Sequence, residues 1–130
     1  LSARAEVGAG DRVMIPGFVI GGSQSVQVLV RGAGPTLGPL GVSGVLEDPL
    51  IEVYDSTNTQ IATNDDWETT AQLQALKDAF VTAGAFDFNL GSKDAALLLT
   101  LPPGSYTAHI KGKGSAVGVA LLEVYFLRGL

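Results

Sequence analysis

The sequence of 130 residues predicts an all-β fold, a β-sandwich or jelly roll of about 7–8 strands with one short helix near residues 70–83. Short runs alternate apolar and polar residues, which is the period of a β-strand. Gly- and Pro-rich turns separate these runs at hairpin spacing, and the strands do not alternate with helices as in a parallel sheet. We expect an extended N-terminal arm over residues 1–10 and a single sandwich domain over residues 11–130.

The first half of the chain contains five predicted strands. They are residues 1–9, 13–20, 26–31, 50–54 and 59–63. Pro16 and Gly17 suggest a bulge or an edge position for the second of them, because proline cannot donate to a strand ladder. Residues 32–44 are rich in Gly and Pro and predict a long loop, whereas the Asp- and Asn-containing residues 55–58 predict a hairpin turn.

The predicted helix has an apolar face. Its apolar residues recur at helical spacing: Leu73, Leu76, Phe80 and Ala83. Thr69 and Gln72 have the spacing of a capping box at the start, and Gly84 is a typical residue for the end. This short amphipathic helix is expected to pack flat on a sheet or to close one end of the sandwich.

The last third of the chain predicts strands over residues 95–101, 106–111 and 117–127. Ala96–Leu101 and Ala120–Phe126 are apolar on both faces, although a strand in a simple sandwich alternates. These two strands therefore require a second cover, supplied by the helix or by another subunit.

The composition excludes several classes of protein. Eight Lys and Arg stand against 13 Asp and Glu, a net charge of −5, which argues against a nucleic-acid partner. The chain has no Cys and one His, so thiol chemistry and a multi-His metal site are excluded, and we expect no enzyme. No apolar run reaches the length of a membrane-spanning helix. Plentiful Gly, Ser, Thr and Val with little Lys indicate an extracellular or cell-surface location.

Residues 47–74 form an acidic segment with seven carboxylates and no Lys or Arg. Asp55 begins the predicted hairpin turn, and Asp65 and Asp66 follow its second strand. Ca²⁺ prefers such hard oxygen ligands, so these three carboxylates are a candidate calcium site, the single cofactor that the sequence offers. The alternative, that Asp and Asn only form turns and cap strand ends, fits better because the spacing matches no EF-hand loop.

The aromatic residues and the single His have competing interpretations. Trp67 is expected in the core, although an exposed Trp beside carboxylates could stack on a sugar ring. Tyr106 is likewise expected to be a core residue. His109 alternates with the apolar positions of its strand, which predicts a solvent-facing ring and no catalytic role.

Several segments together resemble a known family. They are Leu1–Gly8, Ile15–Gly22, Val28–Leu37, Asp48–Asp55, Ile61–Trp67, Lys93–Leu97, Leu101–Ala108 and Gly118–Tyr125. In these segments, which span nearly the whole chain, the sequence resembles a β-sandwich module of secreted and surface proteins of Gram-negative bacteria. The hairpin and the Pro-Gly-Ser-Tyr-Thr turn are also similar, more weakly, to pre-peptidase C-terminal domains, some of which bind calcium. The resemblance implies a sandwich and an extracellular location, and it implies no settled activity.

The favoured functional hypothesis is an extracellular structural subunit that assembles with copies of itself into a filament or surface polymer. The N-terminal arm carries a small apolar face, formed by Leu1, Ala3, Ala5 and Val7. An arm of this length could extend roughly 30 Å and add a strand to a neighbour's sheet. A head-to-tail contact of that kind does not close and produces a filament.

Two other hypotheses remain open. An adhesion or carbohydrate-binding module of a larger secreted protein would use Trp67, Tyr54 or Tyr106 as sugar platforms, with calcium in the acidic loops. A hydrolase would need two carboxylates that face each other across a cleft, and the spacing does not require such a pair.

Overall fold

The computed structural model describes residues 1–8 and 13–127 and confirms the predicted β-sandwich. Within these residues the strands are β1 (Ser2–Val7), β2 (Gly17–Ile20), β3 (Val26–Ala33), β4 (Pro49–Tyr54), β5 (Gln60–Asn64), β6 (Ala95–Leu101), β7 (Gly104–Gly112) and β8 (Gly118–Phe126). The helical elements are α1 (Leu73–Ala83) and the single-turn 3₁₀ helices η1 (Pro35–Leu37) and η2 (Trp67–Thr69). In this part of the chain no helix is both long and apolar enough to cross a membrane.

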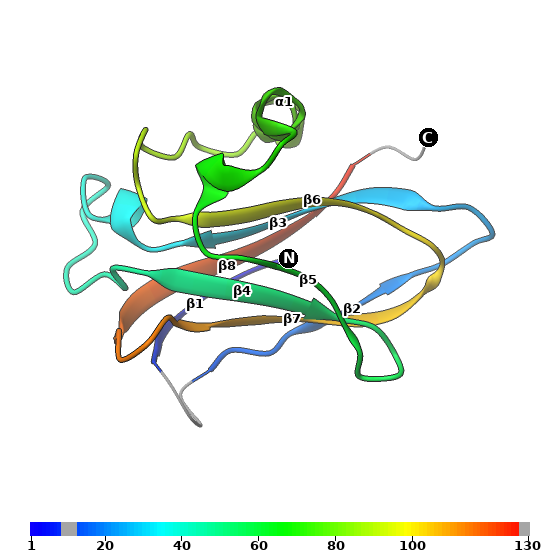
Figure 1. Ribbon diagram of the computed structural model, residues 1–130, viewed down its shortest axis with the longest axis horizontal. Helices are drawn as coiled ribbons and strands as arrows, with labels where there is room; N and C mark the ends of the chain where they lie inside the picture. The colour runs from blue at the N-terminus through cyan, green and yellow to red at the C-terminus, as the bar shows by residue number, and fades with distance from the viewer. Residues whose placement is uncertain (9–12, 128–130) are drawn as a thin grey trace.

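The strands form two antiparallel sheets of four strands each. Sheet A has the order β1-β8-β3-β6 and sheet B the order β2-β7-β4-β5. The two sheets lie face to face, and α1 covers the outer face of sheet A (Figure 1). Within the described residues no helix covers sheet B, so the two faces of the molecule differ in character.

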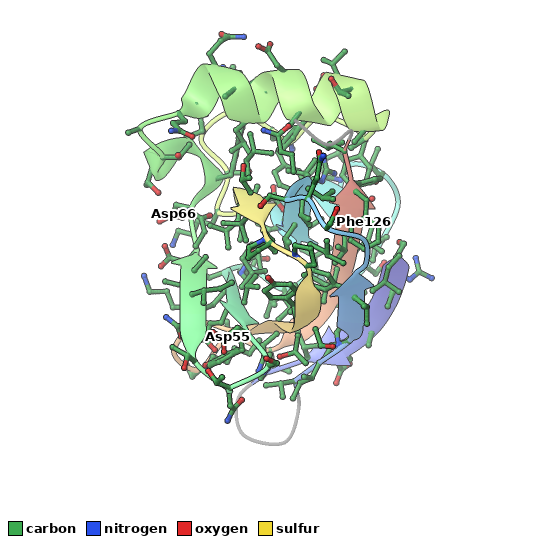
Figure 2. The ribbon with its side chains drawn as sticks, turned by 90° about the vertical axis from the view of Figure 1, so that its right-hand side faces the viewer. Asp55, Asp66 and Phe126 are labelled. Carbon is green, nitrogen blue, oxygen red and sulfur yellow. The ribbon has the colours of Figure 1, made fainter. Side chains whose placement is uncertain are left out.

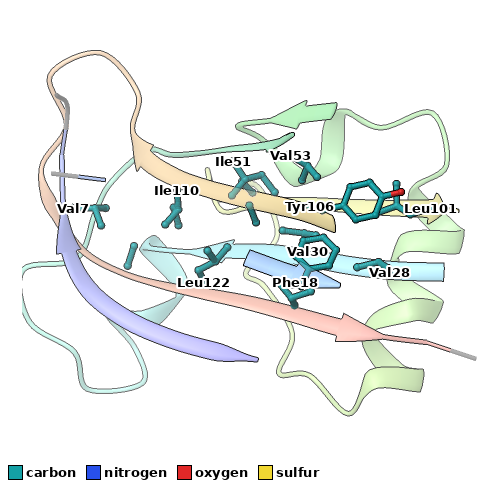
Figure 3. Packing of buried hydrophobic residues seen from close by; sticks show 14 of the residues in the cluster. Val7, Phe18, Val28, Val30, Ile51, Val53, Leu101, Tyr106, Ile110 and Leu122 are labelled. Carbon is teal, nitrogen blue, oxygen red and sulfur yellow. The ribbon is translucent and has the colours of Figure 1, made fainter. Parts of the chain in front are cut away.

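The inner core lies between the two sheets and is built from alternate residues of their strands. Val28 and Val30 of β3 face Ile51 of β4 and Ile110 of β7, and all four side chains are fully buried (Figure 3). The neighbouring residues of these strands point to the opposite faces, as the period of two requires. The alternation read from the sequence therefore identifies the inner face correctly.

A second core explains why two strands are apolar on both faces. The outer face of β3 contributes the buried Leu29, and α1 contributes Leu76 and Phe80, with Trp67 of η2 beside them. Partly buried Leu98 of β6 packs against this cluster. The second cover that the sequence required is the helix of the same chain. Its apolar stripe lies flat on sheet A.

The two ends of α1 differ in how well the sequence predicts them. The predicted capping box is wrong, because the Thr69 hydroxyl donates to the Asp66 carbonyl at 2.7 Å. The helix begins after Gln72, whose side chain makes no capping hydrogen bond. At the other end Gly84 has a φ of 69°, and its N–H donates to the Val81 carbonyl at 3.1 Å, so the predicted C-terminus is confirmed.

Of the two positions that Pro16 and Gly17 suggested, a bulge or an edge, the structure shows the edge, in a shortened strand. β2 spans Gly17–Ile20 and pairs only with β7, at the edge of sheet B. Before Pro16, a single bridge joins Met14 to Ile110. Because proline interrupts the ladder, the predicted strand over residues 13–20 is divided into this bridge and a strand of four residues.

The N-terminal segment is not a separate arm in this structure. β1 pairs with β8 of the same chain, from Ser2 opposite Glu123 to Val7 opposite Gly118. The prediction that residues 1–10 extend away from the sandwich is corrected over this range, since Ser2–Val7 is an edge strand of sheet A. Residues 9–12 lie outside the described part of the chain.

Candidate functional site

The three carboxylates of the candidate calcium site do not come together. Asp55 lies at the turn between β4 and β5, whereas Asp65 and Asp66 follow the far end of β5 (Figure 2). The intervening ladder keeps these positions roughly 10 Å or more apart along the strands. Among the described residues no group of three His, Cys, Asp or Glu side chains could hold a metal ion. The predicted set of Asp55, Asp65 and Asp66 is therefore corrected.

Asp55 instead organises its own turn. Its Oδ1 atom accepts hydrogen bonds from the N–H of Thr57 at 2.9 Å, the hydroxyl of Thr57 at 2.7 Å and the N–H of Thr59 at 3.1 Å. The hydroxyl of Thr57 and then the N–H of Thr59 lower the pKa of Asp55, because these hydrogen bonds stabilise the charged form. The turn-forming role of this residue was the alternative that the sequence favoured.

Asp65 and Asp66 have another carboxylate as their neighbour, Asp48. Lys113 forms an ion pair with Asp65, and its backbone N–H donates to the Asp48 carbonyl at 2.9 Å. Burial raises the pKa of Asp48, Lys93 opposes this shift, and the charge on Asp66 adds to it. The Oδ1 atom of Asp48 is buried and has no hydrogen-bond partner in the described part of the chain. Sequence reasoning missed Asp48 because it precedes β4, far from Asp65 along the chain.

A buried Arg is the most unusual polar residue of the molecule. Arg31 lies on the outer face of β3 and is completely buried beneath α1. Its guanidinium carbon lies 4.5 Å from the ring centre of Phe80, 4.4 Å from that of Phe86 and 4.1 Å from that of Phe88. Its Nη1 atom donates to the Phe86 carbonyl at 2.6 Å. With no access for a substrate, this group serves to hold the second core together.

Asp94 is a second buried charge with a structural role. Its carboxylate accepts hydrogen bonds from the N–H of Gly34 at 2.7 Å, the hydroxyl of Thr36 at 2.5 Å and the hydroxyl of Ser92 at 2.6 Å. The loop after β3 is thereby fixed to the start of β6. Gly34 is required there, because a Cβ atom at this position would lie 2.0 Å from the Leu46 carbonyl oxygen.

The aromatic candidates are mostly core residues. Trp67 is 2% exposed and Tyr106 is 7% exposed, so both predicted core positions are confirmed. His109 lies half-buried on the outer face of sheet B, with its ring 4.4 Å from the ring of Tyr54 and its Nε2 atom 3.3 Å from the Thr107 hydroxyl. Burial lowers the pKa of His109. Of the three proposed sugar platforms, only Tyr54 remains at the surface.

The predicted interface residues lie on β1 or, for Leu1, directly before it, and the geometry of that strand defines an open edge. The N–H of Leu1 donates to the Val124 carbonyl at 3.1 Å, and the N–H of Val124 donates to the Leu1 carbonyl at 2.9 Å. Because such exchange alternates along an antiparallel ladder, Ala3, Ala5 and Val7 also point their backbone groups toward β8. The backbone groups of the residues between them point away from the sheet.

Ser2 and Arg4 therefore carry backbone N–H and C=O groups on the free side of β1, with no strand beside them in the described structure. Their side chains lie on the outer face of sheet A and are exposed. On the opposite, inner face of the strand the side chains are mostly small and incompletely covered. Ala5 is exposed, Leu1 is 60% exposed, and only Val7 is fully buried. This edge is the most accessible feature among the predicted site residues.

Comparison with known proteins supports the fold. No protein-family model and no curated protein sequence matches the chain. Among solved structures, the pre-peptidase C-terminal domain of a collagenase from Bacillus anthracis is similar, with a TM-score of 0.57 and 9% sequence identity. The alignment covers 96% of this chain and 88% of that domain. The likeness agrees with the weaker of the two sequence resemblances. The protein is thus a β-sandwich module similar in fold to a pre-peptidase C-terminal domain.

Proposed function

We propose that the protein is a non-catalytic extracellular module that associates with copies of itself through the open edge of β1. The observation that carries this proposal is the row of unpaired backbone groups at Ser2 and Arg4. An unpaired edge is a template for another strand, and pairing satisfies backbone groups on both partners. The composition and the fold likeness support an extracellular location.

The comparison between the edges of the two sheets favours β1 over β2. β2 has only four residues and follows Pro16, two of the usual ways in which proteins protect an edge from association. β1 has six residues, no Pro and a side of small residues that would not obstruct a neighbour. The charge on Arg4 helps to keep the monomer soluble, and the backbone N–H and C=O groups of this edge stay available for pairing.

A pair of proline variants tests the role of this edge. Arg4→Pro removes an N–H that points away from the sheet, so the fold is retained and self-association is lost. Ala5→Pro removes an N–H that bonds within the ladder to β8, so this variant loosens β1 from its own sheet and lowers the melting temperature. Arg4→Ala removes the side chain and keeps the backbone N–H, so its comparison with Arg4→Pro separates the contribution of the side chain from that of the backbone.

Sedimentation velocity over a concentration series, with circular dichroism as a check on folding, measures these outcomes. The wild-type protein is expected to form assemblies that grow with concentration, and the folded Arg4→Pro variant is expected to remain monomeric. A wild-type protein that stays monomeric at its highest soluble concentration contradicts the proposal.

A carbohydrate-binding role is the second candidate, and a single observation favours it. Tyr54 is half-buried on the uncovered outer face of sheet B and packs against His109. An aromatic ring on an open sheet face could stack on a sugar. Glycan-array binding that disappears in a folded Tyr54→Ala variant would support this role, whereas an array without signal leaves self-association as the function.

A further inference from the structure

We infer that the open edge of β6 receives β1 of the next copy, and that the pocket beside β6 takes the Arg4 side chain of that copy. This inference rests on the proposed self-association and identifies the surface of the neighbouring copy that β1 contacts. β6 is the other edge strand of sheet A, on the side opposite to β1. Contact between unlike edges is head-to-tail, so it does not close and would extend sheet A from copy to copy.

The backbone of β6 is open along its second half. The N–H of Ala96 points away from β3, because it donates to the Oδ1 atom of Asn64 at 3.1 Å. By the alternation of an antiparallel ladder, the backbone groups of Leu98 and Thr100 also point away from β3. In the described part of the chain β6 pairs only with β3, so no strand is hydrogen-bonded to these groups, and β5 contacts β6 without pairing with it.

The side chains of this edge are unusual for a surface exposed to water. Leu97, Leu98 and Leu99 are consecutive and only partly buried, and Thr100 beyond them is exposed. Proteins protect sheet edges with charges, Pro or bulges, and the open part of β6 has none of these. An uncharged edge of half-buried leucines is the kind of surface that another strand covers.

The directions and faces of β1 and β6 agree with such pairing. Sheet A is antiparallel throughout and has four strands, so β1 and β6 run in opposite directions. A copy displaced along the sheet without being turned over therefore presents β1 antiparallel to β6. On both strands the residues with outward backbone groups, Arg4 and Leu98 among them, have side chains on the outer face of the sheet. When two such residues pair, their backbone groups therefore meet and their side chains lie on the same face of the extended sheet.

One register also matches side-chain size. If Arg4 lies opposite Leu98, then Ala3 lies opposite Leu99 and Ala5 opposite Leu97. Small residues of one copy then face large residues of the other on the inner side. This pairing would cover the partly buried leucines without overfilling the edge.

The same register places Arg4 beside a polar pocket. A pocket of about 290 Å³ lies next to Leu98, between β5, β6 and the start of α1. Its polar lining consists of Thr63, Asn64, Thr69, Thr70 and Gln72, whose side-chain oxygens can accept hydrogen bonds from a guanidinium.

The charge around this pocket is complementary to arginine. Residues 64–72 supply four of its nine lining residues, and the same segment includes Asp65, Asp66 and Glu68 and no Lys or Arg. The ion pair with Lys113 partly offsets Asp65, which leaves an acidic surrounding near the pocket. An incoming cation is attracted to such a wall, so the pocket fits the positive side chain of β1.

Complementary blocked variants test the inference. Thr100→Pro removes an outward N–H from β6, and Arg4→Pro removes one from β1, so neither variant can polymerise. Val19→Pro is the matched control, since its N–H lies on the free side of β2, an edge strand of sheet B, and this variant is expected to assemble like wild type. Circular dichroism melts confirm that each variant is folded.

An equimolar mixture of Thr100→Pro and Arg4→Pro is the decisive measurement. The first variant keeps β1 open and the second keeps β6 open, so sedimentation velocity is expected to show heterodimers that do not grow. Replacing Arg4 by Ala in the Thr100→Pro partner is expected to weaken this heterodimer roughly tenfold, because the pocket contact is lost. Assembly of Thr100→Pro alone, or a mixture that stays monomeric, overturns the β6 inference while wild-type assembly still stands. A monomeric wild-type protein overturns the proposed function as well.

Discussion

Arg31 donates a hydrogen bond from Nε to the Oε1 atom of Glu123 at 3.0 Å, across the ladder between β3 and β8. Both side chains are buried on the outer face of sheet A, and the Tyr125 hydroxyl donates to the other oxygen of Glu123. Burial, followed by this hydrogen bond, raises the pKa of Tyr125 to about 12. The pair joins two central strands and, through the Phe86 carbonyl, the segment after α1.

Breaking this ion pair from one side is expected to be costly. Arg31→Met leaves Glu123 charged and without its partner in the second core, which costs about 3–5 kcal/mol of unfolding free energy. The double variant Arg31→Met/Glu123→Leu removes both charges and is expected to be more stable than Arg31→Met. Urea unfolding measures all three proteins, with the exposed Arg4→Met as the control within about 0.5 kcal/mol of wild type. A double variant no more stable than Arg31→Met would contradict the coupling.

Asp94 is expected to be the main stabiliser of the loop after β3. Asp94→Ala leaves the N–H of Gly34 and the hydroxyl of Thr36 without their acceptor, at about 1–3 kcal/mol for each buried group. Ser92→Ala removes one donor, and the Asp94 carboxylate keeps its other hydrogen bonds. This variant is therefore expected to lose about 1 kcal/mol of unfolding free energy. Denaturant unfolding distinguishes the two variants, and equal losses would show that the carboxylate does not organise the loop.

Replacement of Asp48 is expected to stabilise the protein in a pH-dependent way. Burial raises the pKa of Asp48 above its ordinary 3.8, so the folded state holds this proton more tightly than the unfolded state. Stability contributed by this group therefore falls as pH rises from the unfolded pKa through the raised folded pKa. Asp48→Asn removes that loss, so its melting temperature exceeds that of wild type at pH 7, and the difference disappears at acid pH.

Thermal melts of both proteins from pH 3 to pH 7 provide the measurement. Glu47→Gln removes the same formal charge from the exposed neighbouring residue and serves as the control. A lower melting temperature for Asp48→Asn at pH 7 would mean that attraction to Lys93 and Lys113 outweighs the burial of the carboxylate.

Calcium is expected to leave the melting temperature unchanged. Asp55 is engaged with its own turn and lies at the far end of β5 from Asp66, so the carboxylates cannot share an ion (Figure 2). A site filled at a hundred times its Kd would add about 2.7 kcal/mol of stability. Melts in saturating calcium and in chelator measure the difference. A rise that Asp66→Asn abolishes would instead place a calcium ion near Asp66.

The sequence by itself determined the local structure. The period of two placed Val28 and Val30 on one face of a strand, Pro16 predicted a bulge or an edge position, and Gly84 marked the end of the helix. These features depend on neighbouring residues and on backbone sterics, which the order of amino acids states directly. The need for a second cover over two strands was also readable, because apolar residues occupy both of their faces.

Only the tertiary structure decided which distant groups meet. Arg31 and Glu123 are 92 residues apart, and Gly34 and Asp94 are 60 apart, yet each pair forms a buried hydrogen bond. The periodicity of a strand gives the face of each side chain and does not give the neighbouring strand. For the same reason the alternation of residues 1–7 could not say that β8 of the same chain would pair with them. Side-chain pattern determines faces, whereas strand order is decided by how both sheets and α1 close over their two cores together.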